Sequence, residues 1–196
     1  MLIDLSLIVL SYLIGSVSAA ILVCRMMRLP DPRLGGSGNP GATNVLRLGG
    51  RLAAALTLVG DFAKGAVPVA VVMLLDRPDA VPGLVGLAAL LGHLYPVFFR
   101  FRGGKGVATA FGVLLAWSWA ALLIAAAVWL LVAALFRYSS LAALAALAAA
   151  PAALAVTGAA SWVIAAMGVI AVLVYWRHRV NIRQLLAGTE RRIGQR

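Results

Sequence analysis

The chain has 196 residues, of which 63% are hydrophobic and only 12% are charged, and its formal net charge is +11. Water-soluble domains are roughly 45–50% apolar, so this composition excludes a soluble globular domain and predicts an integral membrane protein. The single cysteine, Cys24, excludes a disulfide framework. Nothing in the sequence suggests a bound metal or another cofactor, and activity is expected to survive a chelator.

Long charge-free segments predict where the chain crosses the membrane. A helix needs about 20 apolar residues to span about 30 Å of hydrocarbon, and residues 5–24, 52–75 and 81–99 each fit one crossing. Residues 106–136 and 141–176 are longer and are predicted to form two crossings each, with turns at Trp117-Ser118-Trp119 and Thr157-Gly158. The sequence therefore predicts an all-α integral membrane protein with seven transmembrane helices.

The distribution of basic residues predicts the orientation. With seven crossings, fifteen of the seventeen lysines and arginines fall in alternate loops and in a tail that holds six arginines from Arg177 to Arg196. The opposite loops carry only Arg77, and Lys64 lies inside a span. Basic loops face the cytoplasm in a bacterial-type inner membrane. The N-terminus is therefore expected outside and the C-terminus in the cytoplasm.

The positive charge admits two interpretations. A basic cytoplasmic face binds anionic lipid headgroups in any protein of this kind. The same residues could also form a pocket for small anionic substrates. A nucleic-acid partner is not expected, because the charges are dispersed over four short segments without a soluble domain.

Polar clusters follow the first, third, fifth and seventh predicted helices, and all of them fall on the predicted cytoplasmic side. This coincidence predicts one composite site at the cytoplasmic interface. The members are Ser37, Asn39, Thr43 and Asn44, then Gly103-Gly104-Lys105-Gly106, then Ser139 and Ser140, and finally His178 and Asn181.

The segment "LGGSGNPGATN" interleaves donors and acceptors with glycines. Glycines allow positive φ and let several N–H groups turn toward an anion. The segment is therefore predicted to bind substrate, although a plain connector could also be glycine-rich. The candidate ligands here are Ser37, Asn39, Gly41, Thr43 and Asn44.

The segment "FRGGKG" is similar to the end of a nucleotide P-loop, but it lacks the following Ser or Thr and a preceding strand. Its residues are predicted to cradle a simple phosphate, helped by the N-terminus of a helix that starts near Val107. The alternative is a lysine that snorkels to the interface. The candidate ligands are Gly103, Gly104, Lys105 and Gly106.

Four other features have simpler alternatives. His178 and Asn181 are one helical turn apart and could face one ligand, or His178 could be a solvated helix end. Asp61 and Lys64 share a helix face inside a span and are expected to pair, in either a structural or a catalytic role. His93 is either an interfacial histidine or part of the site. Small residues at Ser11, Gly15 and Ala19 predict close helix packing.

Several kinds of chemistry are excluded. The six acidic residues are scattered and do not resemble a metal-bridged phosphotransferase site. Neither histidine begins an H-x4-D arrangement, which argues against the soluble-type glycerolipid acyltransferases that use acyl-CoA or acyl-carrier protein. The residues alone leave the reaction open.

Five stretches together identify a resemblance over essentially the full chain: "GSGNPGATN", "DFAKG", "GHLYPVFFRFRGGKGVAT", "RYSSLAAL" and "HRVNIRQLLAGTE". In this order they resemble the bacterial acyl-phosphate:glycerol-3-phosphate acyltransferases, the PlsY family. The resemblance implies one membrane-embedded acyltransferase domain over residues 1–196, with seven helices and an external N-terminus. It implies transfer of a fatty acyl group from acyl phosphate to the 1-hydroxyl of sn-glycerol 3-phosphate in phospholipid biosynthesis.

The resemblance also implies roles for the candidate residues. The loop from Gly103 to Gly106, with Lys105 and Thr43, would hold acyl phosphate, and Lys105 would neutralise charge on the departing phosphate. Glycerol 3-phosphate would be held by Ser37, Arg47, His178 and Asn181, and Ser140 is a further candidate ligand. Direct attack without an acyl-enzyme is expected, with the proton passing to the substrate's own phosphate or to His178. Membrane lipids and the two substrates are the expected partners, and the chain is expected to act as a monomer.

Two other classes compete with this interpretation. A transporter of a small organic phosphate could use the same basic loops, but transporters place polar sites near the bilayer midplane, often between repeated halves. A purely structural subunit would leave four coincident polar loops unexplained. Glu190 is expected to pair locally with Arg191 or Arg192, or to order the tail, and a structural role is favoured.

Overall fold

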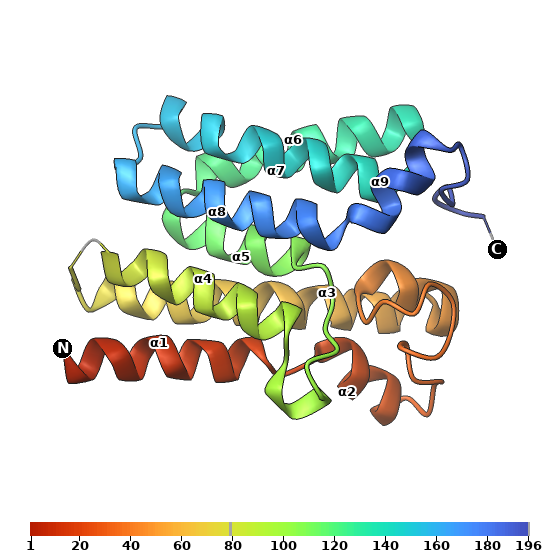
Figure 1. Cartoon of the computed structure of the whole chain (residues 1–196), viewed down its shortest axis with the longest axis horizontal. Coiled ribbons are helices and arrows are strands. Elements are labelled where there is room, and N and C mark those ends of the chain that lie inside the picture. Colours follow the sequence, from red (N-terminus) through yellow and green to blue (C-terminus); the bar gives the residue numbers. More distant parts are fainter. Residues whose placement is uncertain (79, 196) are drawn as a thin grey trace. The chain divides into compact units, whose positions relative to one another are not determined.

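A computed structural model describes residues 1–78 and 80–195. This part of the chain contains helices and no strand, which confirms the all-α prediction (Figure 1). Arg196, which was counted in the predicted basic tail, lies outside the described residues. The helices are α1 (Leu2–Gly15), α2 (Ala19–Met26), α3 (Ala42–Leu74), α4 (Ala80–Leu94), the 3₁₀ helix η1 (Val97–Phe99), α5 (Val107–Trp117), α6 (Trp119–Phe136), α7 (Ser139–Val156), α8 (Ser161–Arg177) and α9 (Arg179–Leu186).

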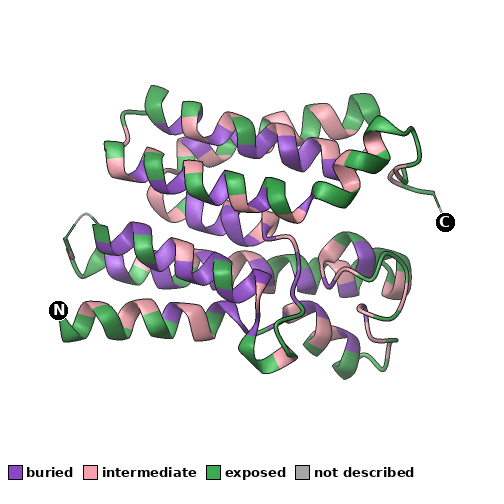
Figure 2. Ribbon diagram, in the orientation of Figure 1, coloured by how far each residue is buried: buried purple, intermediate pink, exposed green. Residues whose placement is uncertain are grey.

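The chain forms two compact units, Met1–Ala116 and Trp117–Arg196. The first unit is built on α1, α3 and α4, with α2 packed on α3. In the second unit α7 packs against both α6 and α8. Within each unit the buried positions line the sides of the helices that face their neighbours (Figure 2). The single acyltransferase domain over residues 1–196 remains a prediction.

Small residues bring the helices of the first unit into backbone contact. A methyl group on Gly15 would overlap the backbone of Ala89, and one on Gly92 would overlap the carbonyl of Tyr12. Ser11 Oγ donates to the carbonyl oxygen of Val85 at 2.8 Å, also across the α1–α4 interface. These contacts confirm the predicted packing role of the small residues in α1, because only small side chains let helix backbones approach this closely.

The predicted crossing over residues 5–24 is divided into two helices. α1 and α2 are bent by 42° at the break between Gly15 and Ala19. Ser18 caps α2, since its hydroxyl accepts a hydrogen bond from Ile21 N at 3.5 Å. The carbonyl of Val17, which the break removes from the helical ladder, instead accepts a hydrogen bond from Lys64 Nζ at 2.9 Å.

The other breaks match the predictions closely. α3 is kinked at Gly50 (φ 78°), so its second part begins where the predicted crossing over residues 52–75 begins. The turn at Ser118 is confirmed, and the Ser118 hydroxyl caps α6 by accepting from Ala121 N at 3.2 Å. The turn at Thr157-Gly158 is also confirmed, because Gly158 has a positive φ of 76°.

The helix lengths support a multi-pass protein. Within the described residues, four helical segments are long and apolar enough to cross a membrane: α3, Ala80–Phe99, α6 and α7. The bent pairs α1–α2 and α8–α9 raise this number to as many as six. α5 has only 11 residues and extends about 16 Å. Seven spans and the orientation of the termini therefore remain predictions.

Candidate active site

The loop before α3 is folded onto the first turn of that helix. Gly36 and Gly38 have φ values of 64° and 69°, in the left-handed region that favours glycine. Asn44 Oδ1 accepts a hydrogen bond from Ser37 N at 2.8 Å. Asn44 Nδ2 donates to the carbonyl oxygens of Pro32 at 2.8 Å and Gly35 at 3.0 Å.

Asn44 therefore organises this loop from inside. Its side chain is buried, at 1% exposure, and its amide uses both donors and its oxygen on the loop backbone. Ser37, Thr43 and Arg47 are exposed around it. The direct contact of Asn44 with substrate remains a prediction.

An Asn44→Asp substitution should destabilise the protein by about 2–4 kcal/mol, because a carboxylate cannot donate to the two carbonyls that Nδ2 now satisfies. The measurement is thermal unfolding of the full chain in detergent. Asn39→Asp is the matched control, since it makes the same chemical change in the same loop at a partly exposed position. Equal shifts in Tm for the two variants would contradict the organising role of Asn44.

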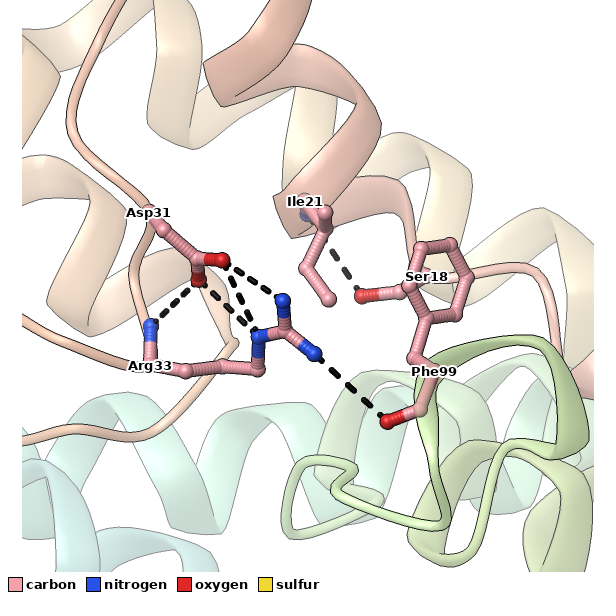
Figure 3. Close-up of polar contacts among 5 residues, drawn as sticks. All are labelled: Ser18, Ile21, Asp31, Arg33 and Phe99. Carbon is pink, nitrogen blue, oxygen red and sulfur yellow. Dashed lines mark hydrogen bonds and ion pairs between the residues drawn. The ribbon is translucent and has the colours of Figure 1, made fainter.

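A second contact ties this loop to the loop after α4 (Figure 3). The Arg33 guanidinium donates to Asp31 through Nη2 at 2.6 Å and Nε at 3.0 Å, and Nη1 reaches the carbonyl oxygen of Phe99 at 3.5 Å. The side-chain hydrogen bonds from Arg33 hold the pKa of Asp31 below its usual value, so the carboxylate stays ionised at a more acidic pH than a free aspartate would. The sequence did not predict Asp31 or Arg33 as a site candidate. An aspartate and an arginine two positions apart predict a local ion pair, but they do not predict a contact with a distant loop.

The glycine loop, residues 103–106, lies against the C-terminal end of α4. Gly104 N donates to the carbonyl oxygen of His93 at 3.2 Å. A methyl group on Gly103 would overlap the His93 carbonyl, and one on Gly104 would overlap His93 Nε2 and lie 3.0 Å from the Pro40 carbonyl oxygen. Only glycine fits at these positions, and the Pro40 carbonyl places the first glycine-rich segment next to Gly104.

α5 begins at Val107, directly after the glycine loop, as predicted. The backbone N–H groups of the first helical turn have no intrahelical partners and attract anions. Gly106 supports this junction with a φ of 86°, and Lys105 is partly buried within the loop. A loop of this composition at a helix N-terminus is suited to hold a phosphate.

Three ionisable side chains lie together behind the glycine loop. Lys64 Nζ and Asp61 Oδ1 are 2.8 Å apart, which confirms the predicted pair. His93 Nδ1 lies 3.5 Å from the same carboxylate oxygen. His93 is 6% exposed, and its side chain lies against the glycine loop.

The second unit holds the remaining candidates. Glu190 Oε1 accepts hydrogen bonds from Ser140 Oγ at 2.6 Å and Asn181 Nδ2 at 2.8 Å, so the carboxylate joins the tail to α7 and α9. This agrees with the prediction that Glu190 orders the tail.

His178 stands at a bend that the sequence did not predict. α8 ends at Arg177, α9 begins at Arg179, and the two helices are bent by 62°. His178 is 2% exposed, and its Nδ1 lies 2.8 Å from the Val174 carbonyl oxygen, so it is not a solvated helix end. Asn181 follows one turn further along α9, as expected.

The structure thus assembles the candidates in two groups. The first unit contains Ser37, Asn39, Gly41, Thr43, Asn44, Arg47 and the glycine loop with Lys105. The second contains Ser140, His178 and Asn181. A single composite site remains a prediction. Among residues 1–78 and 80–195, no three His, Cys, Asp or Glu side chains are grouped to hold a metal ion.

Comparison with known proteins gives one consistent match. The sequence model of the glycerol-3-phosphate acyltransferase family matches residues 5–188. The chain is 54% identical to glycerol-3-phosphate acyltransferase from Halorhodospira halophila over 191 residues, which cover 97% of each protein. It is 53% identical to the protein of that name from Thioalkalivibrio sulfidiphilus over 197 residues, covering 100% of this chain and 97% of that protein.

Two solved structures are also similar, both of the integral membrane glycerol 3-phosphate acyltransferase PlsY (YgiH). The glycerol 3-phosphate form has a TM-score of 0.94 and 42% sequence identity, with coverage of 97% of this chain and 96% of that chain. The lysophosphatidic acid form has a TM-score of 0.91 and 41% identity, with coverage of 97% and 95%.

Proposed function

Since this chain belongs to the glycerol-3-phosphate acyltransferase family, we propose that it transfers a fatty acyl group from acyl phosphate to the 1-hydroxyl of sn-glycerol 3-phosphate. The products are 1-acyl-glycerol 3-phosphate, a lysophosphatidic acid, and inorganic phosphate. The related structures in a glycerol 3-phosphate form and a lysophosphatidic acid form support this pair of substrate and product.

The geometry of the glycine loop is the main observation that supports acyl phosphate as the acyl donor. Three glycines and Lys105 lie at the N-terminus of α5, an arrangement suited to a phosphate group. An acyl phosphate is a mixed anhydride with phosphate as its leaving group, so the enzyme needs orientation and charge stabilisation more than a strong nucleophile. Lys105 neutralises charge on the departing phosphate, and Thr43 completes the donor site.

The acceptor is assigned to residues around the first glycine-rich loop and the α8–α9 bend. Ser37, Arg47, His178 and Asn181 hold glycerol 3-phosphate, and Asn39, Gly41 and Ser140 are additional contacts. The 1-hydroxyl oxygen attacks the acyl carbon, the bond from that carbon to the phosphate oxygen breaks, and phosphate leaves. The hydroxyl proton passes to the acceptor's own phosphate or to His178.

The location of the reaction follows from the charge distribution. The chain crosses a bacterial inner membrane several times, with the basic loops and the site facing the cytoplasm. The acyl donor reaches the site from the lipid, and the acceptor reaches it from the water. The protein acts as a monomer in this proposal and uses no metal or cofactor.

Turnover by the purified full chain in detergent tests the function. Palmitoyl phosphate should release phosphate only when glycerol 3-phosphate is present, and lysophosphatidic acid should form in equal amount. Palmitoyl-CoA should not replace the donor. Uptake of glycerol phosphate into sealed vesicles without acyl transfer would overturn the proposal in favour of a transporter.

Direct attack has its own test. Intact-mass analysis of enzyme quenched during turnover should show no added palmitoyl group. A palmitoyl ester on Ser37 would instead demonstrate an acyl-enzyme and overturn this version of the mechanism.

A further inference from the structure

The buried cluster of Asp61, Lys64 and His93 has no part in the proposed chemistry. The three residues are exposed by only 3%, 7% and 6%. Ionisable groups buried in an apolar helical bundle are costly, and a buried ion pair is often no more stabilising than apolar side chains of similar volume. The contacts of the cluster indicate what it does.

Asp61 is the centre of the cluster and lies between the α1–α2 break and the C-terminal end of α4. On one side Lys64 pairs with Asp61 Oδ1 at 2.8 Å and donates to the Val17 carbonyl oxygen at the α1–α2 break. On the other side His93 Nδ1 lies 3.5 Å from the same Oδ1. The carboxylate therefore lies beside the Nδ1 edge of the imidazole ring, at ion-pair distance.

The opposite edge of that ring lies against the glycine loop. His93 Nε2 is so close to Gly104 that a methyl group there would overlap it. The His93 backbone carbonyl accepts the hydrogen bond from Gly104 N at 3.2 Å and also lies against Gly103. Both the side chain and the backbone of His93 thus limit where the loop can lie.

We propose that His93, oriented by Asp61 and Lys64, is a positioning residue that holds the glycine loop in the conformation required by the phosphate of the acyl donor. Glycines have no side chains to anchor them and lose more conformational freedom on ordering than any other residue. The loop therefore depends on its neighbours for order, as metal ligands depend on the groups that support them. This inference rests on the proposed function for the identity of the donor.

Variants of His93 distinguish positioning from simple packing. The amide nitrogen of glutamine can take the place of Nε2, and that of asparagine the place of Nδ1. His93→Gln should keep the KM for palmitoyl phosphate close to that of the unmodified chain. His93→Asn and His93→Ala should raise this KM about tenfold, because the side chain that packs against Gly104 no longer supports the loop, with less than a twofold change in the KM for glycerol 3-phosphate.

Removing the carboxylate gives a second test. Asp61→Asn alone would leave Lys64 buried with a charge and could fail to fold. The double variant Asp61→Asn, Lys64→Met removes both charges and should raise the KM for palmitoyl phosphate as His93→Asn does. An unchanged KM in the folded double variant would overturn the role of Asp61.

Thr109→Val is the matched structural control. Thr109 is fully buried, and its hydroxyl donates to the backbone carbonyl of Asp61 at 2.9 Å rather than to the Asp61 carboxylate that faces His93. This variant should lower the Tm and leave both KM values unchanged. Equal effects of Thr109→Val and His93→Ala on the two KM values would show that His93 only stabilises the fold.

Hydrogen exchange separates this inference from the proposed donor. In the substrate-free protein, amides of the peptide that contains residues 103–106 should exchange at least about tenfold faster in His93→Ala, while Thr109→Val leaves them protected. This measurement involves no acyl phosphate. Unchanged exchange in His93→Ala would overturn the positioning role of His93 even if the acyltransferase activity is as proposed. If palmitoyl phosphate fails as a donor, the exchange measurement still decides whether His93 orders the loop.

Discussion

A Lys105→Ala variant is expected to fold normally and to lose acyl transfer by about 100- to 1,000-fold in kcat, the loss typical of removing one group that stabilises charge in a transition state. Lys105 stands in the glycine loop, immediately before the N-terminus of α5. Negative charge grows on the phosphate as the acyl–oxygen bond breaks. Phosphate release from palmitoyl phosphate with saturating glycerol 3-phosphate measures the effect.

Arg102→Ala provides the matched control for Lys105. Arg102 is an exposed cation three positions earlier in the same segment. Its removal changes the net charge equally but should alter kcat by less than about threefold, because exposed charges are screened by solvent and salt. If Lys105→Ala behaves like Arg102→Ala, then Lys105 is an interfacial lysine that snorkels into the headgroup region, and the donor site lies elsewhere.

A Gly104→Ala variant is expected to lower kcat/KM for palmitoyl phosphate by about 10- to 100-fold, since overpacking of a close contact typically costs 1–3 kcal/mol. The added methyl group would overlap His93 Nε2 and approach the Pro40 carbonyl oxygen. The loop must move away from both neighbours to accept it. Steady-state kinetics with each substrate varied in turn shows whether the donor site is the one affected.

Gly168→Ala is the control for that substitution. Gly168 lies within α8, and a methyl group there meets no atom within 4 Å. Alanine is favoured over glycine in a helix by roughly 0.5–1 kcal/mol, so this variant should keep its activity and unfold at the same or a higher temperature. Comparable losses of activity in the two variants would contradict the steric argument for Gly104.

Features that depend on short stretches of chain could be predicted from the sequence. The turns at Ser118 and Thr157-Gly158 follow from a capping hydroxyl and a glycine with positive φ, which are local preferences. The start of α5 at Val107 follows from the glycines before it, and the Asp61–Lys64 pair follows from helical spacing. The order of the five motifs was enough to identify the family.

The number of crossings was harder to predict, because length alone does not determine where a segment is divided. The segment over residues 106–136 was expected to form two crossings, but the break at Ser118 leaves 11 residues in α5 and 18 in α6. Hydrophobicity specifies that these residues avoid water, whereas the depth of each helix is set by the helices that pack against it.

Only the tertiary structure revealed the contacts that hold the candidate site residues in place. Three contacts join residues that are far apart in the sequence or separated by turns. They are the contact of His93 with Gly104, the bond from Arg33 to the Phe99 carbonyl, and the bonds of Glu190 with Ser140 and Asn181. The same polar residue type can bind either a substrate or a backbone carbonyl, so the sequence does not show which partner a polar side chain has. By itself the sequence determined the apolar segments, the local breaks and the family motifs, because these are properties of neighbouring residues. The structure decided which polar groups satisfy one another, because buried polar groups must find partners and only the packed helices bring those partners within reach.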